Sequence, residues 1–224
     1  MHYLLHLNKG LILCHCSSSY GSHDAGHIFN LARVNFVKKS ILLRSSAQLC
    51  TANVAKQLSP IYHNYIVLRA GMLNDLLYTY HSSTWINDID KVTLDFFKKC
   101  CVYVGKGKGS RKFQHVNRYQ FKSTLNCSSL HTEIREEWRQ GGGVVILHLH
   151  PEINNFEAHC REFALIKATG LDNLCNSYNG VAYGMMKHGW TNDDIITFGN
   201  MLFYNALIMC INDPPDVIMP YHCY

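Results

Sequence analysis

Residues 102–111 read VYVGKGKGSR, and this stretch decides how the middle of the chain is expected to fold. Two valines around a tyrosine predict a strand, whereas the three glycines that follow predict a flexible turn. Ser110 is a favourable N-cap residue, so a short helix is expected to begin there. The stretch therefore predicts a strand that ends at Val104, a glycine turn and then a helix.

The alternation of glycine and lysine also suggests a nucleotide-binding loop, but the spacing of the glycines excludes one. The phosphate-binding loop has four residues between two glycines, followed by Lys and then by Ser or Thr. Here a single residue separates neighbouring glycines, and Ser110 follows Gly109 instead of a lysine. The dinucleotide fingerprint needs a third glycine three residues after the second, and this stretch lacks it.

Composition places the chain among globular proteins. Its 224 residues are enough to bury one sizeable core, and 47% are hydrophobic while 17% are charged. Ten cysteines are scattered without a CxxC pair, which disfavours a structural zinc site. Polar residues interrupt the first ten positions, so a signal peptide is not predicted. We therefore expect reduced thiols and a nuclear or cytoplasmic protein, not a secreted one.

Positive charge is concentrated in one part of the chain. The net charge is +5, yet the window from Phe96 to Thr132 holds eight lysines and arginines and no acidic residue. The remainder of the chain is consequently slightly acidic. Because the basic window is centred on the glycine stretch, we interpret it as a face that binds an anionic partner and not only as a solvated surface.

The hydrophobic pattern predicts an α+β domain over residues 59–224, preceded by an N-terminal extension (1–58) of unknown role. Strands are expected at 64–68, 100–104 and 144–150, the last of them apolar enough to be central. Helices are expected within 87–99 behind a cap at Asp88, over 132–140, over 155–170 behind a capping box at Asn154, and over 191–211.

The helix expected at 191–211 is apolar almost all round. Asn200 and Asn205 argue against a membrane span, so a buried or partner-covered helix is the better interpretation.

Glu162 is out of place in the helix expected at 155–170. Its neighbours one turn away are Ala158, Leu165 and Ile166, and a carboxylate among apolar groups is costly unless something neutralises it. A nearby lysine or arginine is one explanation. A divalent metal ion, which prefers hard oxygen ligands, is the other.

Four further residues have chemistry that suits a phosphate. Arg111 and His115 are four apart, so both face the same side of the helix expected there, and an arginine can hold a phosphate with two hydrogen bonds. Tyr65 and Tyr103 fall on two strands that could pair as neighbours. Each tyrosine could instead be a core residue with a satisfied hydroxyl.

The order of these residues resembles the GIY-YIG nuclease superfamily, and in particular the nuclease domain of ankyrin-repeat-and-LEM-domain endonucleases. NYIVL (64–68) stands for the first half-motif and YVG (103–105) for the second. Further matches in the same order, over about residues 62–211, are GGGVVILHLH (141–150), FEAHCREFALIKATGLDNLCN (156–176) and GVAYG (180–184). The resemblance implies a small, mainly antiparallel three-stranded sheet flanked by helices.

The resemblance also implies a function, namely hydrolysis of DNA phosphodiester bonds by an endonuclease, on branched or distorted DNA. A single Mg²⁺ or Mn²⁺ ion on the metal-binding glutamate would assist the reaction, the arginine would hold a phosphate oxygen, and one tyrosine would position or deprotonate the attacking water. The residues that match the catalytic positions are Tyr65, Tyr103, Arg111, His115, Glu162 and Asn176.

Within this reading, His115 would orient a tyrosine and Asn176 would fix the local backbone. Tyr62 competes with Tyr65 for the first tyrosine position, and either Tyr65 or Tyr103 could take the proton. DNA binding is expected at Lys106, Lys108, Lys112 and Arg118. The alternative function is a catalytically inactive nucleic-acid-binding module on the same fold.

Overall fold

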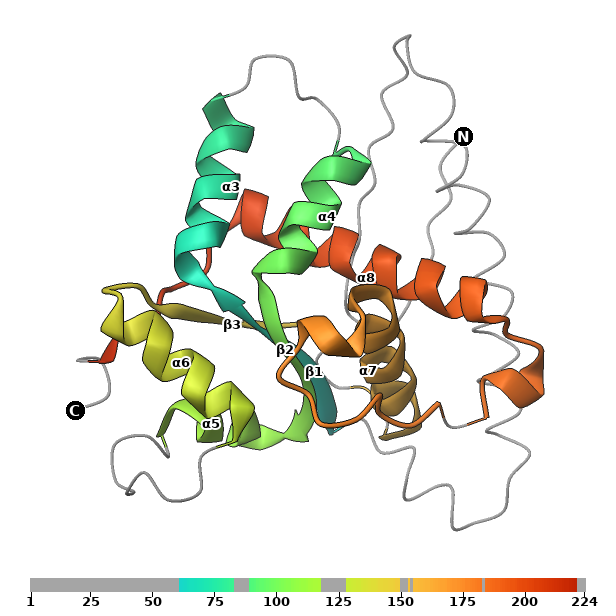
Figure 1. Ribbon diagram of the computed structural model, residues 1–224. Helices are drawn as coiled ribbons and strands as arrows, with labels where there is room; N and C mark the ends of the chain where they lie inside the picture. The colour runs from blue at the N-terminus through green and yellow to red at the C-terminus, as the bar shows by residue number, and fades with distance from the viewer. Residues whose placement is uncertain are drawn as a thin grey trace, which may run out of the picture.

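The computed structural model describes residues 61–82, 89–117, 128–149, 153, 155–182 and 184–220 (Figure 1). Three strands, β1 (Tyr62–Arg69), β2 (Cys101–Lys108) and β3 (Val144–His148), form a sheet in the order β2-β1-β3 with both pairs antiparallel. This confirms the expected α+β fold with a small antiparallel sheet. The strand expected to be central, β3, lies at an edge, and β1 occupies the centre instead. The N-terminal extension (1–58), Asp88, Arg118 and Asn154 lie outside the described residues.

Helices cover both faces of the sheet. The α-helices are α3 (Ala70–Ser82), α4 (Lys91–Cys100), α5 (Gln114–Asn117), α6 (Ser129–Arg139), α7 (Asn155–Thr169) and α8 (Asn192–Asn212). Short 3₁₀ turns are η1 (Gly109–Phe113), η4 (Leu171–Asn173) and η5 (Met186–His188). The longer helices predicted from the sequence are α4, α6, α7 and α8, and each is present. The short helix expected to begin at Ser110 is instead the 3₁₀ turn η1 followed by α5, which begins at Gln114.

Two helix starts show how local side chains set the boundaries. Asp90, not the expected Asp88, is the N-cap of α4, and its carboxylate accepts a hydrogen bond from the backbone N–H of Thr93 at 2.7 Å. Thr191 and Asp194 form a reciprocal capping box at the start of α8, where the sequence predicted a cap.

The glycine stretch does not form the turn that the sequence predicts. β2 continues through Gly105 and Gly107 to Lys108, and only Gly109 has a positive φ, of 52°. Ser110 lies inside η1 and does not cap it, since the N-cap position falls on Lys108 without a side-chain hydrogen bond. The strand is longer than expected because β1 pairs with it as far as Lys108.

The sheet separates two hydrophobic clusters. On one face, Ile66 and Leu68 pack with α3, α4, α7 and α8 in the larger cluster. On the other face, Tyr65 and Val67 pack with Leu130 and Ile134 of α6 in the smaller one. Alternate residues of β1 therefore serve opposite layers, as the two-residue period of a strand requires.

α7 is fixed between the sheet and α8. The side-chain amide of Asn64 on β1 donates a hydrogen bond to the carbonyl of Ala158 on α7, at 2.9 Å. On its other side α7 meets α8 at Gly199, where an added Cβ would overlap the carbonyl oxygen of Ala164 and lie 2.6 Å from the Cβ of Ala168. Only a glycine allows the two helices to approach this closely.

α8 is, within the part of the chain that is described, the one helix long and apolar enough to cross a membrane by length and composition. Its buried residues pack into the larger core cluster, for example Phe203 against Phe97 of α4, with ring centroids 6.3 Å apart. It is thus a helix with a face buried in the protein, as the sequence predicts.

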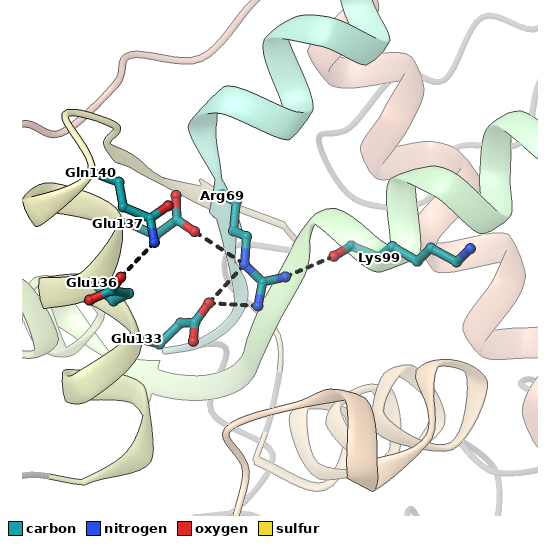
Figure 2. A network of polar contacts seen from close by, with 6 residues as sticks. All are labelled: Arg69, Lys99, Glu133, Glu136, Glu137 and Gln140. Atoms are coloured by element: carbon teal, nitrogen blue, oxygen red, sulfur yellow. Dashed lines mark hydrogen bonds and ion pairs between the residues drawn. The ribbon is translucent and has the colours of Figure 1, made fainter.

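Arg69, at the end of β1, links three elements (Figure 2). Its guanidinium contacts the carboxylates of Glu133 and Glu137 on α6, and donates to the carbonyl of Lys99 near the end of α4 at 3.1 Å. The Glu133 contact is the tighter one, with Nε–Oε1 at 2.7 Å. This network holds α6 beside the sheet, and α6 in turn contributes Leu130 to the lining of a pocket beside β2.

Candidate active site

A pocket of about 630 Å³ lies at the outer edge of β2. Its volume is in the range typical of ligand sites. Side chains from β2, η1, α5, α6, α7 and the loop after η4 line it. They include five of the six residues expected from the sequence to be catalytic: Tyr103, Arg111, His115, Glu162 and Asn176. The structure therefore brings together residues that are spread over more than 70 positions of the chain.

The two tyrosines are neighbours: Tyr103 lines the pocket and Tyr65 is buried behind it. Tyr65 is only 1% exposed, and its hydroxyl is 2.8 Å from Nε2 of His115. Tyr103 lines the pocket, with its ring centroid 6.2 Å from that of Tyr65. Tyr62 is three residues from Tyr65 and so faces the opposite side of the sheet, where Lys106 and Lys108 lie over its ring. Of the two candidates for the first position, the geometry places Tyr65 beside Tyr103.

Gly105 and Gly107 provide space for the site. A Cβ at Gly105 would lie 2.6 Å from the Tyr65 hydroxyl oxygen and 2.8 Å from Cε1 of Tyr103. A Cβ at Gly107 would lie 2.9 Å from Cβ of Arg111. Both glycines are in ordinary strand positions, so what they supply is the absence of a side chain and not a special backbone conformation.

The outer edge of β2 is closed by groups that belong to the site. The backbone N–H of Cys175 donates to the carbonyl of Val102 at 2.7 Å. The Asn176 side chain then pairs with both backbone groups of Val104, accepting from its N–H at 3.0 Å and donating to its carbonyl at 2.8 Å. This is the backbone-fixing geometry expected for Asn176, and it leaves the strand edge unavailable for pairing with another chain.

Glu162 lies beside this strand edge, where burial disfavours the ionised form of its carboxylate. Its side chain is 13% exposed, and burial raises the pKa of the carboxyl to about 7 despite the opposing positive charges of Lys106 and Arg111 and a hydrogen bond from the backbone of Lys106. Among the described residues, no lysine or arginine forms an ion pair with it. The pairing that the sequence leaves open as an explanation is therefore not found in this part of the chain.

His159, which the sequence analysis missed, is a further polar group close to that carboxylate. Its Nδ1 lies 3.8 Å from Oε2 of Glu162, one turn away on α7. Burial, and then the charge of Lys106, lower the pKa of His159 to about 4, so the imidazole is neutral at physiological pH. The spacing of three residues on a helix was the signal that could have found it.

The donor set at Glu162 fits a hard divalent cation that keeps most of its waters. Within the described residues, no group of three or more His, Cys, Asp or Glu side chains is placed to hold a metal ion. Zinc prefers such a closed set of ligands, whereas Mg²⁺ is commonly bound by one or two carboxylates and several waters. A single strained carboxylate that faces a polar pocket suits the second kind of site.

Three of the four expected DNA-binding residues are described, and they lie on different faces of the sheet. Lys106 reaches Asn155 on α7 at 3.2 Å, and Lys108 is exposed above Tyr62. Lys112 lies on the opposite face, where its charge adds to burial in lowering the pKa of His148 to about 4. These three lysines therefore lie on both faces of the sheet beside β2 instead of forming one flat surface.

The fold and the pocket together match what is expected of a GIY-YIG nuclease domain. The sheet has three antiparallel strands, and two adjacent tyrosines, an arginine and a buried glutamate lie at the edge of one of them. The family model described as LEM-3-like GIY-YIG domain matches residues 62–223. Because this match covers well over half of the chain, the protein belongs to that family.

Three relatives are similar over part of their length. The Ankyrin repeat and LEM domain-containing protein 1 homolog of Caenorhabditis elegans is 28% identical over 150 residues, covering 60% of this chain and 21% of the relative. Ankyrin repeat and LEM domain-containing protein 1 is 29% identical in Homo sapiens and 28% in Mus musculus, covering 57% of this chain in both cases and 22% and 24% of the relatives. The matched region thus spans less than a quarter of each relative. No solved structure is significantly similar to the chain.

Proposed function

We propose that this protein is a metal-dependent endonuclease that hydrolyses phosphodiester bonds of branched or distorted DNA, in the nucleus or cytoplasm. Family membership supports nuclease activity. The observation that carries the proposal further is the meeting of Tyr103, Arg111 and Glu162 in one pocket. A non-catalytic DNA-binding module would need the basic face but has no use for a strained carboxylate buried beside it.

Glu162 is the residue that would hold the cation, with waters completing its coordination. When bound there, Mg²⁺ or Mn²⁺ supplies positive charge to the phosphate and to the leaving 3′ oxygen. The carboxylate is already oriented for this role by α7 and by the backbone N–H of Lys106. His159 remains neutral beside it and adds no competing positive charge.

Arg111 would hold a non-bridging oxygen of the same phosphate. Its side chain starts at η1 and lines the pocket, and the absence of a side chain at Gly107 leaves room for it. A guanidinium can donate two parallel hydrogen bonds to a phosphate, and such fixed donors stabilise the charge that develops during attack.

Tyr103 is the tyrosine best placed to take the proton of the attacking water. It faces the pocket, whereas Tyr65 is buried behind it. Burial raises the pKa of Tyr103, and the charge of Glu162 adds to that, but Arg111 and a hydrogen bond from Tyr65 act in the opposite direction. Tyr65 would then be a positioning residue, joined at 2.8 Å to His115, that stabilises the Tyr103 phenolate.

Two substitutions separate the catalytic arginine from an ordinary phosphate contact. Arg111→Ala is expected to lower kcat by about 10² to 10³ because it removes a donor to the developing charge. Lys108→Ala is the matched control, an exposed cation outside the pocket. It is expected to weaken DNA binding and to reduce the slope of log affinity against log salt by about one, with kcat retained.

Single-turnover cleavage and equilibrium binding at several salt concentrations measure both effects. If the two variants lose only binding, and to the same extent, Arg111 is one more surface cation and the catalytic assignment is wrong.

A further inference from the structure

An exposed aromatic ring lies at the mouth of the active-site pocket. Tyr178 is 70% exposed, and it lines the pocket together with Tyr103, Arg111 and Glu162. It is close enough to Tyr103 to contribute, after burial and Glu162, to raising the pKa of that phenol. Exposed aromatic residues are common on protein surfaces, so exposure alone implies nothing. Tyr178 differs from other exposed aromatic residues in its position beside the pocket and in the hydrogen bonds that hold the neighbouring backbone.

The loop that carries Tyr178 is anchored on both sides. Before it, Cys175 and Asn176 are hydrogen-bonded to the edge of β2. After it, Gly180 packs on α7, where an added Cβ would lie 3.6 Å from the Cα of Phe163. The exposed residues 177–179 are therefore a short span between two fixed points. A backbone held in this way loses little conformational freedom when a ligand binds.

We propose that Tyr178 is a stacking platform for an unpaired nucleobase next to the scissile phosphate. This inference deepens the proposed function and rests on it. A phosphate held at Arg111 brings the attached nucleosides to the rim of the pocket, where Tyr178 is the exposed ring among the lining residues that the structure describes. Every base has a π-face, so the contact does not depend on sequence.

The same contact selects for DNA structure. In an intact duplex both faces of a base are covered by its neighbours, so a base must leave the stack before it can reach Tyr178. Unstacking costs free energy in a paired duplex and much less at a branch point, a flap or a mismatch. Tyr178 therefore favours DNA that already contains an unpaired base beside the cleavage position.

The test measures stacking directly, with the full chain in EDTA so that the DNA stays intact. A set of flap DNAs carries 2-aminopurine at successive unpaired positions around the branch point, and a linear duplex serves for comparison. The wild type, Tyr178→Phe and Tyr178→Ala are titrated and followed by anisotropy and 2-aminopurine fluorescence. Tyr78→Ala is the matched control, since Tyr78 is 77% exposed on α3 and is not part of the pocket lining.

The wild type, Tyr178→Phe and Tyr78→Ala are expected to quench 2-aminopurine at one position. Tyr178→Ala is expected to lose that quench and about 10-fold in affinity for the flap, with duplex affinity unchanged. The stacking role of Tyr178 would be overturned if Tyr178→Ala kept both its affinity for the flap and the quench of 2-aminopurine. It would also be overturned if the variant lost the same affinity for the flap and for the linear duplex. Quenching by a wild type that makes no cleavage product in Mg²⁺ would overturn the proposed nuclease function while leaving the platform in place.

Discussion

Glu162 is the residue at which burial and charge conflict most clearly. Its carboxyl is largely shielded from water, and burial raises its pKa to about 7. Below about pH 7 the metal-free protein therefore favours the neutral acid, and a divalent cation then has to displace a proton to bind. A buried carboxylate without a paired cation is destabilising for the fold alone and useful only if something binds it.

This conflict predicts a pH-dependent difference between the wild type and Glu162→Gln in EDTA. A folded-state pKa raised from 4.5 to about 7 contributes stability that is full below about pH 4.5 and is lost as pH rises through 7. The glutamine variant has no such dependence at this position. It should unfold with nearly the same free energy as the wild type at pH 4.5, and should be more stable by on the order of 3 kcal/mol at pH 8.

Urea titrations at both pH values, with and without Mg²⁺, measure the difference and provide the control. Added Mg²⁺ should stabilise the wild type at pH 8 and leave Glu162→Gln unchanged, because only the native carboxylate binds the ion. A pH-independent difference would show that the carboxyl is not strained in the folded state.

The sequence revealed some of these residues and not others, for physical reasons. Glu162 was found because its apolar neighbours lie on the same helix and can be read from local spacing. His159 lies one turn from Glu162 on the same helix, a spacing that allows the contact, but spacing alone does not show which way the two side chains turn. Tyr178 was missed because its position depends on hydrogen bonds from its loop to a strand more than 70 residues away.

At the scale of elements, β2 is the strand on which the site is built. One of its faces carries Tyr103, its outer edge binds Asn176 and Glu162, and its two glycines leave room for the groups packed against it. The sequence predicted a turn here because glycine is a common turn residue. That rule considers only the local chain, whereas pairing with β1 keeps the strand extended to Lys108.

Gly105→Ala tests the role of the strand glycines. Its methyl group would lie 2.6 Å from the Tyr65 hydroxyl oxygen, so the tyrosines must shift. We expect a loss of about 10²-fold in kcat, because small displacements of catalytic groups are sufficient for that. A stability loss of about 1–3 kcal/mol, as for other overpacked cores, should accompany it.

DNA binding in EDTA separates the two causes. Retained binding with lost cleavage supports displacement of the tyrosines. If a folded Gly105→Ala protein cleaved DNA at the wild-type rate, the close contact between this strand and Tyr65 would not be needed for the reaction.

At the scale of the whole molecule, the position of Glu162 depends on two layers of packing. Asn64 holds α7 to the sheet, and Gly199 allows α8 to approach α7 next to Ala164. The sequence predicted both helices and the Thr191 cap of α8, since these are local features. It did not give the strand order, because the apolar character of β3 suggested a central position and the pairing of strands depends on tertiary contacts.

Gly199→Ala should move α7 and lower both stability and activity. The added methyl would overlap the carbonyl oxygen of Ala164, two residues from Glu162, so α7 and α8 must separate. We expect a net loss of about 1–3 kcal/mol in the free energy of unfolding. The control is Gly71→Ala on α3, where nothing lies within 4 Å and where alanine should stabilise the helix by up to about 1 kcal/mol. Chemical denaturation of both variants measures this, and equal effects would contradict the close α7–α8 contact.

Cleavage of DNA by the wild type and by Glu162→Gln tests the central claim most directly. Both proteins are incubated with flap and linear DNA in Mg²⁺ and in EDTA, and products and binding are measured in parallel. We predict that the wild type cleaves in Mg²⁺ and not in EDTA, with the flap preferred. Glu162→Gln should cleave in neither condition but bind DNA in EDTA as the wild type does. Binding without cleavage by the wild type would make the protein a DNA-binding module, and equal cleavage by Glu162→Gln would show that the metal-dependent site lies elsewhere.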